Sequence, residues 1–317
     1  MELGQQLSLL LGDFSHLSSR IRHLDYDCTA CGERIEVRCS YLSFRGGEPT
    51  VDEFVDMLSE HVIPFCLPRA DIFESKKALI DGDHVKAGRI FTALSERAKA
   101  LFIKAQKGSS RSGEAGEIVL YILNEWILKA PQIVSKMYLK TNANMPVHGT
   151  DGIHARYDEI EKKLYLYWGE SKAHATLSSA LASALQSIKQ FVEEAHEKRE
   201  IQLISAYPDL SGMSSEAQQA LMKYLDPYSD ESLARVAVFS CLLIYEQKSD
   251  TAGFADNEIE KAFVGKINSA AVEFIAKIQG NVTTAGLGLK RFDFFLLPVP
   301  SVQGLRDKFQ ERIGWPK

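Results

Sequence analysis

The chain has 317 residues, 45 % of them hydrophobic and 25 % charged, a composition that excludes disorder as the dominant state. Its 37 Lys and Arg against 42 Asp and Glu give a net charge of −5, which excludes a protein that binds nucleic acid through a basic surface all round. No run approaches the roughly 18 apolar residues of a membrane span, and Glu2 stands where a secretory signal would carry a basic residue. We therefore expect a cytoplasmic protein without membrane contact.

The first part of the chain predicts a small α/β region. Glu33–Phe44 alternates like a strand, and Thr50 begins a helix that Pro64 ends. A helical pattern then runs from Pro68 to about residue 106, with a break at Asp81–Asp83. We interpret residues 1–107 as an N-terminal regulatory or partner-docking region.

Charge is unevenly distributed along the chain. Lys76–Arg111 holds nine Lys and Arg against three Asp and Glu, whereas Glu193–Glu260 holds five against fourteen. The basic stretch is either a solvated helix face or a surface that leads DNA to a site.

Five cysteines are an odd number for a disulfide scaffold. Cys28, Cys31, Cys39 and Cys66 could form a zinc site, but the irregular spacing of the last two leaves that open. Cys241, within an apolar run, is interpreted as a core residue.

A glycine- and serine-rich joint at residues 108–113 precedes a second region, residues 113–317, in which the pattern sharpens. Its core elements are predicted as a helix at Glu114–Lys129, strands at Ile133–Leu139, Gly149–Tyr157 and Lys163–Trp168, a helix at Thr176–Arg199 and a buried strand at Arg235–Tyr245. Predicted additions follow as a helix at Asn257–Gln279, a loop at Gly280–Leu289, a strand at Arg291–Val299 and a helix at Ser301–Arg312. The fold class is α/β.

Three short motifs in this region carry polar residues that could form a site. They are GEAGE (Gly113–Glu117) at a helix start, GTDGIH (Gly149–His154) at a strand start and GESK (Gly169–Lys172) at a strand end. Glu170 and Lys172 are two residues apart, so both project from one face of a strand. A hairpin over residues 158–162 would bring Asp151 across from them.

Two carboxylates and an ammonium on one face are a set that phosphodiester hydrolysis can use. Carboxylate oxygens bind Mg²⁺ or Mn²⁺, and the lysine can stabilise developing negative charge. Glu117, or alternatively Glu114, could add a third carboxylate from the helix start. The competing interpretation is a surface salt-bridge cluster on a charged hairpin.

The element order and the Asp151, Glu170, Lys172 pattern resemble the PD-(D/E)xK nuclease superfamily, whose restriction-endonuclease-like core runs helix, three-strand meander, helix, strand. Thr150 stands where that superfamily usually has proline. The pieces GEAGE, HGTDGIH, WGESK and FFLLPVPSVQGLRDKF are more specific and resemble the HamA family, the nuclease subunits of the Hachiman anti-phage system. This resemblance covers roughly Glu114 to the C-terminus.

The resemblance implies a metal-dependent DNA endonuclease or nickase, the effector of a bacterial defence complex with a superfamily-2 helicase (HamB-like) as partner. It also implies that Glu117, Asp151 and Glu170 bind Mg²⁺ or Mn²⁺ and that Lys172 is catalytic. The alternatives are a stand-alone restriction or repair nuclease and a non-catalytic interaction subunit.

Other polar residues near the motifs have weaker grounds. Gln186, Lys189 and Gln190 could support the site from the following helix, although a solvated helix face predicts the same residues. His148, His154 and His174 flank the motifs, and strand alternation puts His154 on the face opposite Asp151. We interpret these histidines as structural or solvent-facing.

Overall fold

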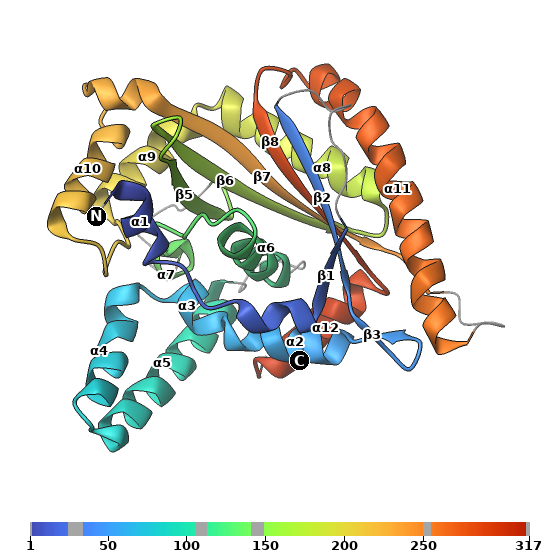
Figure 1. Ribbon diagram of the computed structural model, residues 1–317, viewed down its shortest axis with the longest axis horizontal. Helices are drawn as coiled ribbons and strands as arrows, with labels where there is room; N and C mark the ends of the chain where they lie inside the picture. The colour runs from blue at the N-terminus through green and yellow to red at the C-terminus, as the bar shows by residue number, and fades with distance from the viewer. Residues whose placement is uncertain (1, 25–33, 106–112, 141–148, 250–254, 315–317) are drawn as a thin grey trace.

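A computed structural model of the chain describes residues 2–24, 34–105, 113–140, 149–249 and 255–314. Its centre is a six-stranded mixed sheet between two layers of helices (Figure 1). Across the sheet the strands are β1 (Ile21–Leu24), β2 (Ile35–Leu42), β8 (Arg291–Val299), β7 (Arg235–Glu246), β6 (Lys163–His174) and β5 (Gly152–Asp158). The four central strands are parallel, and the two edge strands pair antiparallel with their neighbours.

Each face of the sheet has its own hydrophobic core. One core involves α8 (Leu177–Glu193), α9 (His196–Ala206), α10 (Ser215–Leu225) and α11 (Asp256–Thr284). The other involves α2 (Val51–Glu60), α3 (Val62–Cys66), α5 (His84–Ala105), α6 (Glu114–Trp126) and α12 (Val302–Arg312). Smaller elements are α1 (Leu3–Ser8), α4 (Arg69–Ile80), α7 (Lys136–Lys140) and the ribbon β3 (Phe44–Arg45) and β4 (Glu48–Pro49).

The α/β class and most predicted elements are confirmed. The nearly all-apolar run at residues 235–245 is β7, a central strand with buried side chains on both faces, as its composition indicated. β1 and β2 belong to the same sheet as the later strands, while α4 and α5 form a helical arm that projects from it (Figure 1). The division of function between residues 1–107 and 113–317 stays a prediction.

Several predicted elements differ from the structure. Pro64 does not end the helix that begins after Thr50, because α2 ends at Glu60 and Pro64 lies inside α3. The strand predicted at Lys163–Trp168 continues to His174 as β6.

The strand at Ile133–Leu139 is wrong: only Gln132 bridges to His154, and the chain then turns, with the Lys136 N–H donating to the Val134 carbonyl, into α7. The meander is therefore a β5–β6 hairpin with a one-residue bridge at its edge.

The helix predicted at Thr176–Arg199 is two helices, α8 and α9, because Ala195 adopts a left-handed conformation with φ 52°. The loop predicted at Gly280–Leu289 begins too early, because α11 continues to Thr284. Ile278 and Val282 keep the buried helical spacing on either side of Gly280, so packing outweighs the glycine there. Among the described residues, no helix is long and apolar enough to cross a membrane.

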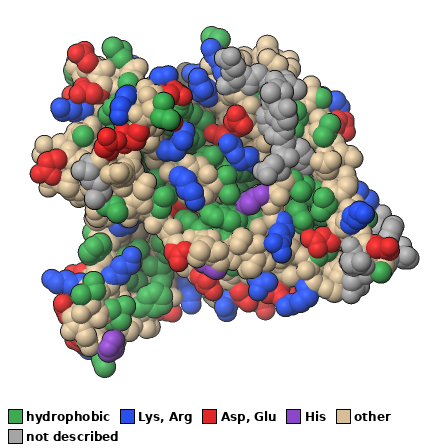
Figure 2. Space-filling model, in the orientation of Figure 1, with side chains coloured by type: hydrophobic (Ala, Val, Ile, Leu, Met, Phe, Trp, Pro, Cys, Tyr) green, Lys and Arg blue, Asp and Glu red, His purple; other side chains and the backbone are tan. Residues whose placement is uncertain are grey.

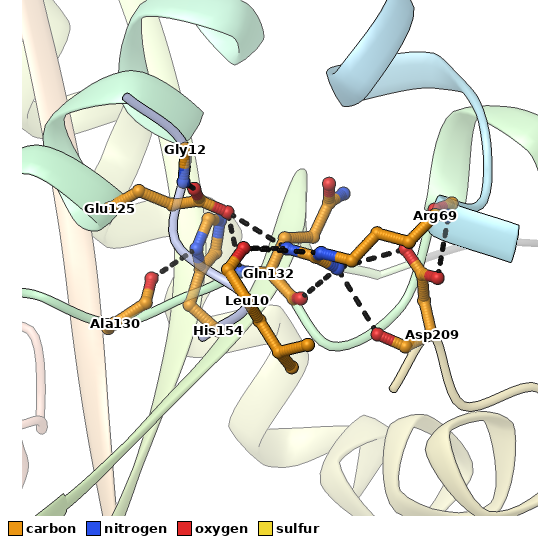
Figure 3. Close-up of polar contacts among 9 residues, drawn as sticks. Leu10, Gly12, Arg69, Glu125, Ala130, Gln132, His154 and Asp209 are labelled. Carbon is orange, nitrogen blue, oxygen red and sulfur yellow. Dashed lines mark hydrogen bonds and ion pairs between the residues drawn. The ribbon is translucent and has the colours of Figure 1, made fainter. Parts of the chain in front are cut away.

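A partly buried guanidinium, that of Arg69, joins the projecting arm to the body of the molecule (Figure 3). Arg69, the first residue of α4, donates to the carbonyls of Leu10 (3.0 Å), Gln132 (2.8 Å) and Asp209 (3.1 Å). It also pairs with the carboxylates of Asp209 (2.9 Å) and Glu125 (3.3 Å). Three irregular segments and α6 thus converge on one side chain, and we call this cluster the Arg69 hub.

Removing the Arg69 side chain should strongly destabilise the protein. Glu125 and Asp209, whose side chains are 0 % and 5 % exposed, would lose their cation. Arg69→Met is expected to lower the free energy of unfolding by about 3–5 kcal/mol in urea titrations. Arg89→Met, at an exposed position of α5, is the matched control and should change it by less than about 0.5 kcal/mol. Equal effects of the two changes would contradict this role of the hub.

Stability should fall as the solution becomes acidic, because two histidines are buried in the neutral form. Burial lowers the pKa of His154 to about 3 and, together with the charge of His16, that of His61 to about 4, from 6.5. Below pH 6.5 the unfolded chain binds protons that the folded chain does not. The free energy of unfolding should therefore decrease by about 1.4 kcal/mol per pH unit per histidine between pH 6.5 and about 4. His154→Gln should flatten this slope in urea titrations at several pH values, and an unchanged slope would contradict the assignment.

Candidate active site

The β5–β6 hairpin brings Asp151 to the GESK motif. Gly152 pairs with Gly169 in the antiparallel register, and the Asp151 N–H donates to the Gly169 carbonyl (2.8 Å). The Asp151 Oδ2 in turn accepts the Ser171 N–H at 2.7 Å. Main-chain hydrogen bonds on both sides therefore hold the Asp151 carboxylate beside residues 170–172, as the predicted hairpin required.

Glu170 and Lys172 form an ion pair on β6. The Lys172 Nζ lies 2.5 Å from the Glu170 Oε1, and the side chains are 25 % and 10 % exposed, respectively. Burial alone would lower the pKa of Lys172, but the carboxylates of Glu170, Asp151 and Glu117 outweigh it and raise that pKa. Lys172 therefore keeps its positive charge, and all three predicted acidic residues act on it electrostatically.

Asp151, Glu170 and Lys172 line one pocket of about 430 Å³. Its other wall comes from α8 and the start of α9, which contribute Ser187, Gln190, His196 and Arg199. Lys172 also lines a second pocket of about 510 Å³, together with His174 and Arg306. Two hollows therefore lie at the end of β6, and Lys172 lines both.

Two of the predicted metal ligands fit a divalent cation at this pocket. Asp151 and Glu170 present carboxylate oxygens to one pocket, and Mg²⁺ is commonly held by one or two carboxylates plus waters and substrate phosphates. In the described part of the chain, no three His, Cys, Asp or Glu side chains are grouped closely enough to hold a metal ion. Glu117 does not line the pocket, so its role as a ligand stays a prediction, as does that of Glu114.

Two buried residues that sequence reasoning missed bind the main chain of Thr150, next to Asp151. The Lys136 Nζ donates to the Thr150 carbonyl (2.5 Å) and pairs with the Glu200 Oε1 (2.7 Å), which also accepts the Thr150 N–H (3.1 Å). Lys136 and Glu200 are 64 positions apart, and neither belongs to a local motif. No signal in the sequence connects them.

Of the three polar residues predicted to support the site from the following helix, one lines the pocket and two do not. Gln190 lines the pocket, whereas Gln186 is exposed and Lys189 pairs with Glu193 on the helix surface. His154 lies on the opposite face, as alternation predicted, and its Nδ1–H donates to the buried Ala130 carbonyl. His148 lies outside the described residues.

The zinc site considered from the sequence finds no support. Cys28 and Cys31 lie outside the described residues. Cys39 and Cys66 are buried in different cores, one on each face of the sheet, so these two do not share a site. Cys241 is a core residue, as predicted.

The glycine of the GEAGE motif that precedes Glu117 sets the distance between α6 and β6. A Cβ at Gly116 would lie 2.3 Å from the Ser171 Oγ but 3.5 Å from the Ser171 Cβ and 3.6 Å from Ile244. Hydrogen at this position thus lets the helix start directly against the strand that carries Glu170 and Lys172. Gly116 therefore has a packing role that does not depend on the chemistry proposed for Glu117.

The effect of Gly116→Ala on the free energy of unfolding should change sign when Ser171, the residue opposite it, is replaced by alanine. In the parent chain the new methyl group meets the Ser171 hydroxyl and should cost about 1–3 kcal/mol of unfolding free energy. In a Ser171→Ala background the clash is gone, and the better helix propensity of alanine should make Gly116→Ala neutral or stabilising by up to about 1 kcal/mol. Thermal and urea unfolding of the four-member cycle measure this, and a destabilisation that persists in the Ser171→Ala background would disprove the contact.

Comparison with known proteins agrees with the family resemblance of the motifs. The family model named HamA matches residues 18–313, which include the hairpin, the pocket and both helical layers. A comparison with curated proteins finds no match. With the match extending over nearly the whole chain, the protein belongs to the HamA family, and its role lies in Hachiman anti-phage defence.

Proposed function

We propose that this protein is a metal-dependent DNA nuclease, an endonuclease or nickase that acts as the DNA-cutting subunit of a Hachiman defence complex. One observation carries the proposal: Asp151, directly before β5, meets Glu170 and Lys172 of β6 in a single pocket of about 430 Å³. A salt-bridge cluster on a solvated hairpin would not need this convergence, and the Glu170 and Lys172 side chains are 10 % and 25 % exposed.

Each residue has a distinct part in the proposed reaction. Asp151 and Glu170 would hold Mg²⁺ or Mn²⁺, and the Ser171 N–H keeps the Asp151 carboxylate turned to the pocket. The cation, when bound, would neutralise charge on the scissile phosphate and acidify a water. Lys172 remains charged beside the carboxylates and would stabilise the negative charge that develops on the phosphate.

Cations on both sides of the carboxylates support a polyanionic substrate. Arg199 lines the pocket of Asp151, and Arg306 lines the neighbouring pocket beyond Lys172. A nucleic-acid strand that crosses the end of β6 would bring its phosphates to cationic side chains in both pockets. Phosphate contacts of this kind position a strand without reading its sequence.

The projecting arm supports a protein partner, which we propose to be a superfamily-2 helicase subunit. Phe73, Ile80, Val85 and Phe91 are 52 %, 83 %, 73 % and 57 % exposed on α4 and α5. Figure 2 displays hydrophobic atoms gathered over this arm. Exposed apolar surface of this extent commonly marks an interaction site.

Cleavage and metal binding should separate in two variants of the pocket. Glu170→Ala removes a proposed ligand, so Mg²⁺ affinity and cleavage should fall together. Lys172→Ala leaves both carboxylates, so metal should still bind while the cleavage rate falls by about 10²–10³-fold. The assays are plasmid cleavage with the helicase subunit present, calorimetric Mg²⁺ titration and thermal melting. A Lys172→Ala protein that cuts at the parent rate would leave only the salt-bridge interpretation.

Charge on the arm should disrupt the complex without harming the subunit. Ile80→Asp with Val85→Asp changes two exposed side chains and should weaken helicase binding at least about tenfold with an unchanged melting temperature. Ile160→Asp, at a 95 % exposed position in the β5–β6 turn, is the matched control. Helicase binding is measured by analytical ultracentrifugation. If the parent, the arm variant and the control bind equally well, the arm is not the docking site.

A further inference from the structure

The residue before Asp151 rests on a completely buried ion pair. The Lys136 and Glu200 side chains are 1 % and 2 % exposed, and both bind the main chain of Thr150, one at its carbonyl and the other at its N–H. The Lys136 Nζ also lies 3.3 Å from the Thr150 hydroxyl. Every polar group of Thr150 is therefore within reach of the pair.

Glu200 also packs closely against the residue before Thr150. Gly149 has φ 127°, and a Cβ there would lie 2.0 Å from the Glu200 Oε1. The carboxylate thus lies directly against the backbone that leads into Asp151. Glycine is required at residue 149 both for the conformation and for this approach.

Stability alone is a poor explanation for such a pair. Burying two charges costs free energy that their attraction repays only in part, and apolar residues of similar volume often serve as well. The second oxygen of Glu200 has no hydrogen-bond partner in the described part of the chain, which adds to the cost. What apolar residues could not supply is a donor and an acceptor for the Thr150 main chain.

We propose that Lys136 and Glu200 are positioning residues, which set the Asp151 carboxylate for the divalent cation by clamping the peptide units of Thr150. The inference rests on the proposed function, because Asp151 is taken as a metal ligand. Lys136 and Glu200 do not line the pocket themselves, and both bind the main chain of Thr150, which does. Glu200 also follows Arg199 on α9, so the same clamp fixes the pocket wall that carries Arg199 relative to Asp151.

The first test replaces the pair by apolar residues. Lys136→Met/Glu200→Leu leaves no charge unpaired but removes both partners of the buried Thr150 main chain, so it should melt several degrees below the parent while still folding. Its affinity for Mn²⁺, measured by electron paramagnetic resonance without DNA, should fall about 10–100-fold, as when outer-shell support of a ligand is lost. Amide hydrogen exchange at Asp151, whose N–H donates to Gly169, should become at least about tenfold faster. Lys277→Met/Glu273→Leu, at the exposed Lys277–Glu273 ion pair of α11, is the control and should alter neither quantity.

A second pair of variants separates length from charge and does not depend on the double variant folding. Glu200→Gln keeps the reach and the acceptor oxygen for the Thr150 N–H, so Mn²⁺ affinity should stay within about threefold of the parent. Glu200→Asp keeps the charge but withdraws the oxygen by one methylene, so affinity should fall about tenfold or more. The opposite order would mean that Glu200 acts through its charge and would overturn the clamp.

Mn²⁺ binding distinguishes a failure of this inference from a failure of the proposed function. If Asp151→Asn abolishes Mn²⁺ binding but the Met/Leu double variant binds like the parent, the pair is only structural and the inference fails alone. If the parent binds no Mn²⁺, or Asp151→Asn binds it equally well, the proposed metal site fails and the inference fails with it.

Discussion

The hydrogen bonds and ion pairs of the Arg69 guanidinium hold together the segments that surround the candidate site. Buried main-chain carbonyls need hydrogen-bond donors, and the segments at Leu10, Gln132 and Asp209 lie outside regular helices and strands that would supply them. One side chain with five N–H donors satisfies all three. The carboxylates of Asp209 and Glu125 balance its charge, so the segments can be buried together without an uncompensated cation.

The hub and the candidate site are neighbours through one short loop. The Asp209 Oδ2 accepts the Ser135 hydroxyl at 3.0 Å, and the next residue is Lys136, which binds Thr150. Ser135, which binds the hub, is therefore followed directly by Lys136, which binds the backbone before Asp151. Because Arg69 is also the first residue of α4, the root of the projecting arm and the pocket belong to one polar network. Fold stability and site geometry share the same contacts here.

The position of the pocket follows from the sheet. Parallel strands end at the same edge, and β6 extends to His174, well past the last residue that pairs with β5. Its polar residues 170–172 lie where α6 begins on one face and α8 covers the other. Gly116 allows the close start of α6, and the left-handed turn at Ala195 ends the α8 direction so that His196 and Arg199 reach the pocket. Local backbone features thus bring together side chains from β6, α8, α9 and the segment before β5.

Patterns within short stretches of the sequence determined much of this protein. Apolar periodicity predicted β7, β8, α6 and α12, and the spacing of Asp151, Glu170 and Lys172 across a hairpin predicted their convergence, because both depend only on backbone geometry over neighbouring residues. Tertiary structure decided the rest. The chain turns at Val134 instead of continuing as a strand, β2 joins β8, and Lys136 meets Glu200, each through contacts between segments distant in sequence. A buried charge is stable only beside its partner, and that partner is known only once the segments are packed.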